Sequence, residues 1–169
     1  CYIGRQLWYY IETIVYSQIM KKKILLGLLA ILVVIQFIKP ERNLGEIEGP
    51  NHIKNVINYP EDVAEIMTRA CFDCHSNKTN YPWYANVQPV AWFLDSHVRE
   101  GKEHLNFSEF KTYPGKKQAH KLEEVVESLK EGWMPLDSYI WIHKEADLTD
   151  AERIKIADWA QQSMTAIVQ

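Results

Sequence analysis

The sequence predicts an all-α protein in which a small helical domain follows an N-terminal membrane-anchor helix. Three observations support this fold class. Apolar residues recur at helical spacing in four segments after residue 59. No stretch of useful length shows the apolar and polar alternation of a half-buried strand. An apolar run near the start of the chain follows three lysines, as in bacterial export signals.

The predicted signal anchor occupies residues 20–39. Met20 and three lysines precede an apolar run of 15 residues, Ile24 to Ile38, and no small-residue cleavage pattern follows it. We therefore expect a single-pass anchor in the cytoplasmic membrane rather than a removed signal peptide, although the run is slightly short for a span. The lysines should stay cytoplasmic and direct the remaining chain to the periplasmic or outer side. Residues 1–19 are left unassigned, as a start-site artefact or an aromatic segment lying on the bilayer.

A polar linker is expected over residues 40–58, where two prolines and two glycines interrupt the sequence, and the domain itself over residues 59–169. His52 falls within this linker. Pro60 suits the first position of a helix, and the two acidic residues after it complement the helix dipole. The apolar face of this helix leads directly into Cys71.

Three further helices are predicted downstream. The second begins near Pro89, and Gly101 should mark its end or a weak point. The third ends at Gly132, because glycine readily stops a helix. The last begins with a capping box formed by Thr149 and Glu152, and we expect this terminal helix to close over the first.

Cys71-Phe-Asp-Cys74-His75 is the most informative motif of the chain. C-x-x-C-H is the attachment pattern of a c-type haem, with two thiols for the porphyrin vinyl groups and an imidazole that becomes an axial iron ligand. The motif predicts one covalent haem c on Cys71 and Cys74, with His75 as proximal iron ligand. Dithiol redox chemistry and zinc binding stay open as alternatives. A dithiol redox site should follow a strand. A zinc site needs further ligands, yet the only other cysteine is Cys1.

Met134 is the first candidate for the distal iron ligand. It precedes a proline, and a residue in that position is disfavoured in a helix, so we expect Met134 in a loop. A methionine thioether as axial ligand raises the haem potential into a range suited to electron transfer. Its alternative role is to fill a gap in the core. His97, on the apolar face of the second helix, and His143 are alternative distal ligands, although such histidines are more often structural.

Aromatic residues are concentrated after residue 80. Five tryptophans there could bury a haem and exclude water, or could simply enlarge the core of a small domain. Trp83 and Tyr84 follow the motif in a loop and are candidate haem contacts at the propionates.

Several motifs follow one another in a characteristic order. They are Cys71 to Tyr84, Pro89 to Trp92, His97 to Gly101, Leu105 to Phe107, and Met134 to Leu136 with Tyr139, His143 and Ala146. Together they resemble the bacterial haem-binding domain family of cytochrome c-like proteins, over approximately Val56 to Met164. The resemblance implies a single covalent haem, a helical domain and export beyond the cytoplasmic membrane. Carried over by position, it makes Cys71 and Cys74 the thioether sites, His75 the proximal ligand and Met134 the candidate distal ligand.

The predicted function is that of a membrane-anchored monohaem c-type cytochrome domain, an electron carrier rather than an enzyme. The alternative is a haem-based sensor or peroxidase-like enzyme with an open distal site. The first 39 residues hold five of the 19 basic residues and one of the 22 acidic residues. From Pro40 onward there remain 14 basic and 21 acidic residues. This charge of −7 disfavours nucleic acid and favours redox partner proteins with basic docking faces.

Overall fold

The computed structural model describes residues 2–168, which form two compact units. Unit 1 consists of residues 2–40 and 83–92, and unit 2 consists of residues 41–82 and 93–168. Regular structure in the described part of the chain is helical throughout, with no strand beyond one isolated bridge. The all-α prediction is therefore confirmed.

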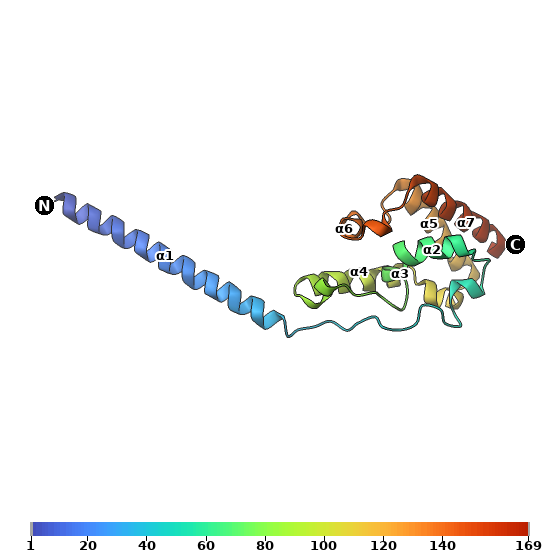
Figure 1. Ribbon diagram of the computed structural model, residues 1–169, viewed down its shortest axis with the longest axis horizontal. Coiled ribbons are helices and arrows are strands. Elements are labelled where there is room, and N and C mark those ends of the chain that lie inside the picture. The colour runs from blue at the N-terminus through green and yellow to red at the C-terminus, as the bar shows by residue number, and fades with distance from the viewer. Residues whose placement is uncertain (1, 169) are drawn as a thin grey trace. The chain divides into compact units, whose positions relative to one another are not determined.

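Unit 1 is built on α1 (Tyr2–Ile35), the long blue helix of Figure 1. The predicted anchor begins within this helix, and its apolar side chains from Ile24 to Val34 are largely exposed. Among the residues that the structure describes, no helix combines the length and the apolar character needed to cross a membrane. The short 3-10 helix η2 (Trp83–Asn86) and the first residues of α4 (Val90–His104) complete the unit.

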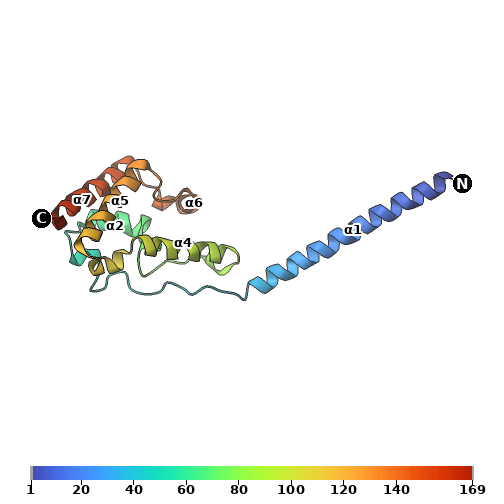
Figure 2. The same cartoon turned by 180° about the vertical axis from the view of Figure 1, so that it is seen from behind.

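Unit 2 arranges the other helices around an apolar core. In chain order they are η1 (Ile53–Asn55), α2 (Glu61–Ala70), α3 (Phe72–His75), the rest of α4, η3 (Phe107–Thr112), α5 (Gly115–Glu131), α6 (Asp137–Ile140), η4 (Lys144–Ala146) and α7 (Asp150–Val168). Figures 1 and 2 show α5 and α7 side by side. The terminal helix thus packs chiefly against α5, and only to a smaller extent against α2, the helix that it was expected to cover.

The helix ends follow their local sequence signals. Gly132 ends α5 in the left-handed conformation, with φ at 79°, and its N–H donates to the Ser128 carbonyl. The capping box is present, because the Thr149 N–H donates to Glu152 Oε2 at 2.9 Å and the Glu152 N–H donates to Thr149 Oγ1 at 3.3 Å. Pro60 is the N-cap residue of α2 rather than its first helical residue.

Part of the segment expected to be a linker packs into unit 2. His52 and Ile53 are fully buried, and Ile53 belongs to the apolar core. The ring Nδ1 of His52 accepts a hydrogen bond from the Lys54 N–H at 3.2 Å, so this histidine caps η1. His52 is therefore part of the packed unit, although the polar composition around it suggested an unpacked spacer.

The two glycines at the ends of α5 allow a matched test of backbone strain. We expect Gly132→Ala to lower the free energy of unfolding by about 1 kcal/mol, because alanine is strained at positive φ. Both positions have room for a methyl group: nothing lies within 4 Å of the Cβ site at Gly132, and the nearest atom at Gly115 is 3.8 Å away. Gly115→Ala should therefore leave stability unchanged or raise it slightly. Urea denaturation followed by circular dichroism measures both, and equal effects would contradict the prediction.

Candidate functional site

A cavity of about 680 Å³ lies in unit 2, lined by residues of α2, α3, α4, α5 and α6 and of the segment after α5. Such a volume is within the range of about 300 to 1,000 Å³ that is common for small-molecule and cofactor sites. Much of the wall is apolar, with residues such as Met67, Leu105 and Leu129. Five of the predicted site residues line this one space: Cys71, Cys74, His75, His97 and Met134.

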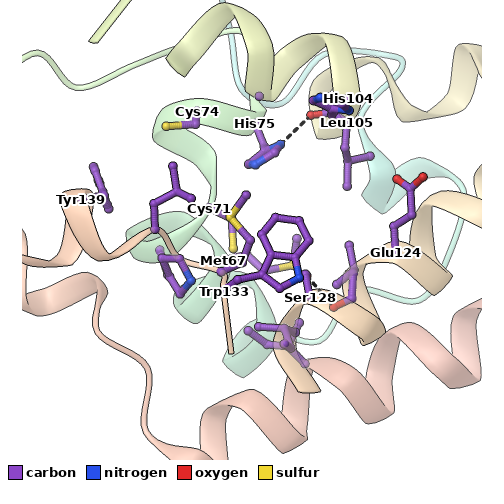
Figure 3. A pocket seen from close by; sticks show the side chains of 18 of the residues that line it. Met67, Cys71, Cys74, His75, His104, Leu105, Glu124, Ser128, Trp133 and Tyr139 are labelled. Carbon is purple, nitrogen blue, oxygen red and sulfur yellow. Dashed lines mark hydrogen bonds between the residues drawn. The ribbon is translucent and has the colours of Figure 1, made fainter. Parts of the chain in front are cut away.

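Helix α2 delivers the C-x-x-C-H motif to the cavity. Its buried face consists of Val63, Ile66, Met67 and Ala70, the apolar positions that the helical spacing predicted. Cys71 interrupts the helix between α2 and α3, and its carbonyl accepts hydrogen bonds from the N–H groups of Cys74 (3.3 Å) and His75 (2.9 Å). This single turn brings both cysteines and the imidazole to the same space (Figure 3).

A backbone carbonyl orients the His75 imidazole. Nδ1 lies 2.9 Å from the Leu105 carbonyl oxygen, the dashed contact in Figure 3, so Nδ1 carries the proton and donates it to this bond. Nε2 then keeps its lone pair, which is the form in which histidine binds a metal. Burial lowers the pKa of His75, and hydrogen bonds to the carbonyls of Leu105 and Gly101 partly oppose this change. The ring is therefore neutral at neutral pH.

The chemistry of the two thiols disfavours the dithiol alternative. Burial raises the pKa of Cys71 to about 12 and that of Cys74 to about 11. Redox-active C-x-x-C sites instead lower the pKa of the attacking cysteine. The zinc alternative also lacks support, because no group of three or more His, Cys, Asp or Glu side chains in the described chain is arranged to hold a metal ion. Cys1 lies outside the described residues.

Gly101 allows α4 to approach the motif closely. Gly101 was expected to mark the end of this helix or a weak point in it. The helix continues through Gly101 to His104, so the glycine does not mark its end. A Cβ atom at Gly101 would lie 2.8 Å from the Cys74 carbonyl oxygen and 3.1 Å from the Cys74 Cβ. Only a residue without a side chain permits such an approach, and Leu105, directly after this helix, then reaches His75.

Polar contacts secure the loop that follows the motif. The side-chain amide of Asn43 donates to the Ser76 carbonyl at 2.9 Å and to Thr79 Oγ1 at 3.0 Å. Its amide oxygen accepts a hydrogen bond from Lys102 Nζ at 2.6 Å. Thr79 Oγ1 in turn donates to the Asp73 carbonyl at 2.6 Å. Residues from before and after the motif in sequence thus hold its loop in place.

Tyr139 connects α6 to the motif. Its hydroxyl donates to Asp73 Oδ2 at 2.8 Å, while Asp73 Oδ1 accepts from the N–H and the side-chain amide of Asn80 at 3.0 and 3.2 Å. Burial, together with the negative charge of Asp73, raises the pKa of Tyr139, so the phenol stays protonated and keeps donating. Because Tyr139 and Met134 belong to the same short stretch of chain, this bond also positions the segment that carries the predicted distal ligand.

The structure separates the candidates for the distal position. Met134 lies in the non-helical segment between α5 and α6, as expected for a residue before proline, and lines the cavity. His97 also lines it, although its Nδ1 lies 2.8 Å from the Phe93 carbonyl oxygen. His143 stacks on Tyr139, with ring centroids 4.3 Å apart, and among the described residues it is not part of the cavity wall.

The aromatic contacts predicted for the propionates are not part of this wall. Trp83 and Tyr84 belong to unit 1, and neither is among the described residues that line the cavity. Trp83 is 79% exposed, and its ring lies edge-on to that of Tyr84 at 5.9 Å. The tryptophan that does line the cavity is Trp133, which faces the motif in Figure 3.

A protein-family comparison agrees with this site. A family described as a haem-binding domain matches residues 30–162, which is most of the chain. The chain belongs to the haem-binding domain family. The resemblance seen in the sequence is thereby confirmed, and haem is the cofactor. No curated protein and no solved structure matches the chain significantly.

Three features of the haem-binding domain were not predicted from its sequence. They are the Leu105 carbonyl at His75, the approach of Gly101 to Cys74 and the bond between Asp73 and Tyr139. Gly101 carried a usable signal, because a glycine inside a helical pattern often marks a close backbone approach. The bond at His75 joins residues that are 30 positions apart in the sequence, and the bond from Tyr139 to Asp73 joins residues that are 66 positions apart. Local sequence patterns do not relate residues at such separations.

Gly101→Ala tests the close approach of α4. Alanine normally stabilises a helix interior relative to glycine by about 1 kcal/mol. Here we expect the opposite, a loss of about 1 to 3 kcal/mol, because the added methyl group would meet the backbone of Cys74. Urea denaturation gives the free energy of unfolding. Stabilisation by this substitution would show that the approach does not constrain the fold.

A pair of tyrosine variants tests the bond to Asp73. Tyr139→Phe removes a hydrogen bond to a carboxylate and should lower the free energy of unfolding by about 1.5 to 3 kcal/mol. Tyr59→Phe is the matched control, because the buried Tyr59 hydroxyl has no hydrogen-bond partner in the described chain. It should cost no stability and could increase it. Equal losses in the two variants, measured by urea denaturation, would contradict the assignment.

Proposed function

We propose that this haem-binding domain is a membrane-anchored monohaem c-type cytochrome domain that transfers single electrons on the outer side of the cytoplasmic membrane. The observation that supports it most directly is that Cys71, Cys74, His75 and Met134 line one cavity. Cys71 and Cys74 supply two thiols at the spacing needed for two thioether bonds to one porphyrin. His75 and Met134 supply two side chains suited to axial ligation.

The residues of the cavity fit a covalently attached haem. A haem bound there supplies an iron that alternates between the ferrous and ferric states, one electron at a time. His75 offers the lone pair of Nε2, because the bond to Leu105 occupies Nδ1. Met134 offers a soft thioether sulfur from a segment that Tyr139 ties to the motif. The apolar wall limits access of water, which influences the potential of a buried redox centre.

Membrane anchoring is proposed from the character of α1. After Lys23, its apolar side chains are exposed on all sides of the helix, including Ile24, Leu25, Leu26 and Val34. A helix that is apolar all round is stable only where a surrounding medium covers it, as a membrane does. The lysines before this stretch favour a cytoplasmic N-terminal side.

A redox partner with a basic docking face is proposed from the charges at the cavity. Glu100, Glu127 and Glu131 line it and are exposed to solvent. They add local negative charge to a chain that is already at −7 from Pro40 onward. Complementary charge on a partner would speed association at low ionic strength.

His97 supports a second candidate function. Its imidazole lines the same cavity, where it could serve as an acid or base next to a ligand on the iron. If Met134 does not bind the iron, the site suits a haem sensor or a peroxidase-like enzyme. Carbon monoxide distinguishes the two: rapid, complete binding to the reduced protein favours this second function, and no binding favours electron transfer.

Three variants test the proposed ligands. Cys71→Ser and Cys74→Ser together should abolish covalent haem, so that acidified organic solvent extracts all pigment. Met134→Ala should remove the near-infrared band of sulfur-to-iron ligation and admit carbon monoxide, whereas His97→Ala should change neither. Visible and near-infrared spectra of haem-matured protein provide the measurement. An unchanged spectrum in Met134→Ala, or loss of the band in His97→Ala, would contradict the assignment of the distal ligand.

A further inference from the structure

We propose that the loop Trp83–Trp92 and the end of α1 form one surface that lies in the membrane interface and extends the apolar length of the anchor. The inference rests on the proposed membrane anchoring, and it gives Trp83 a lipid contact instead of the haem contact expected from sequence. We call this surface the collar. It consists of the exposed apolar residues of two segments of unit 1, namely Phe37, Ile38, Trp83, Val87, Val90 and Trp92.

Hydrogen bonds join the two segments of the collar. Gln36 and Gln88 form a reciprocal pair, in which Gln36 Nε2 donates to the Gln88 carbonyl at 3.2 Å and the Gln88 N–H donates to Gln36 Oε1 at 2.9 Å. The Ile38 carbonyl accepts two more bonds, from Gln88 Nε2 at 2.8 Å and from the indole N–H of Trp92 at 2.9 Å. Gln88 itself is buried, so its three bonds are partly shielded from water, whereas the bond from Trp92 is exposed. Together the four bonds hold this segment against the helix end.

The collar has the composition of a membrane interface. Phe37 and Trp83 are 83% and 79% exposed, an unfavourable state for large rings in water. No charged residue occurs between Trp83 and Trp92. Tryptophan and tyrosine concentrate at lipid headgroups, where the ring is covered by acyl chains and the polar atom stays hydrated or bonded. The Trp92 indole N–H is already satisfied by Ile38, so its ring can enter an apolar layer at little cost.

Length explains why the anchor would use such a collar. The apolar run from Ile24 to Ile38 would extend about 22 Å even if it were helical throughout, and α1 already ends at Ile35, whereas a bilayer hydrocarbon core is about 30 Å thick. At the start of the run, Lys21 to Lys23 can extend their charged ends toward the headgroups. At its end, the collar adds apolar and aromatic surface beside Ile38. Lipid is therefore the occupant that we assign, because the collar continues an apolar helix surface exposed on all sides.

Fluorescence quenching tests this contact in the complete haem-matured chain. The chain is reconstituted into phosphatidylcholine vesicles that contain lipid brominated near the headgroup end of the acyl chains, and tryptophan emission is recorded. We expect bromolipid quenching of wild-type emission and a clear loss of the quenched component in Trp83→Phe. Trp141→Phe is the matched control: Trp141 is 77% exposed but belongs to unit 2, so the quenched component should persist.

A second pair of variants measures the strength of the contact. Val87→Asp with Val90→Asp places two charges on the collar and should increase the fraction that alkaline carbonate extracts from the vesicles. Ile154→Asp, at an exposed apolar position of α7, should not. Unchanged extraction in the collar variant would overturn the proposal.

The remaining outcomes separate the collar from the anchor. Flotation of the chain with vesicles, combined with equal quenching in wild type and Trp83→Phe, would overturn the collar and leave the anchoring in place. Failure of the wild-type chain to float would overturn the anchoring and the collar together. Emission from Trp83 that responds to protein concentration and not to brominated lipid would indicate a second copy of the chain as occupant, and would also overturn the proposal.

Discussion

The contact between α4 and the C-x-x-C-H turn is the constraint on which the rest of the site depends. Gly101 lets the helix come so close to Cys74 that no side chain fits between them. That approach places the Leu105 carbonyl, one turn further on, within hydrogen-bond distance of His75 Nδ1. Helix α4 thus fixes the position of the motif in the cavity wall. It also determines that Nε2 of His75 is the nitrogen left available to a metal.

Two kinds of wall surround the cavity. Helices α2, α5 and α7 share the packed apolar core and leave little freedom to the side that carries the cysteines. The part of the wall that contains Met134 belongs to a short irregular segment, which polar bonds hold in place, such as those from Arg153 to the Met134 carbonyl and from Tyr139 to Asp73. The proposed proximal side is therefore built into the core, whereas the proposed distal side depends on a few polar bonds.

Sequence patterns predicted the features that have a local chemical cause. The capping box at Thr149 and the glycine stop at Gly132 are local signals, and both are present in the structure. Features that depend on distant parts of the chain were missed or misread. Gly101 was read as a helix end or a weak point, although it serves a contact with another element. His52 was placed in a spacer, although its neighbour Ile53 is a core residue. The convergence of the motif, Met134 and His97 on one cavity follows from tertiary packing, which spacing along the sequence does not encode.

The apolar surroundings of the two half-buried motif cysteines also affect their reactivity. The thiolate is the form that attacks disulfides and oxidants. Because their surroundings raise the pKa of Cys71 to about 12 and that of Cys74 to about 11, both thiols are protonated at neutral pH. In the folded chain both thiols are therefore poor nucleophiles before a haem binds. The same apolar wall that lines the cavity thus keeps both sulfur atoms in the protonated, slowly reacting thiol form.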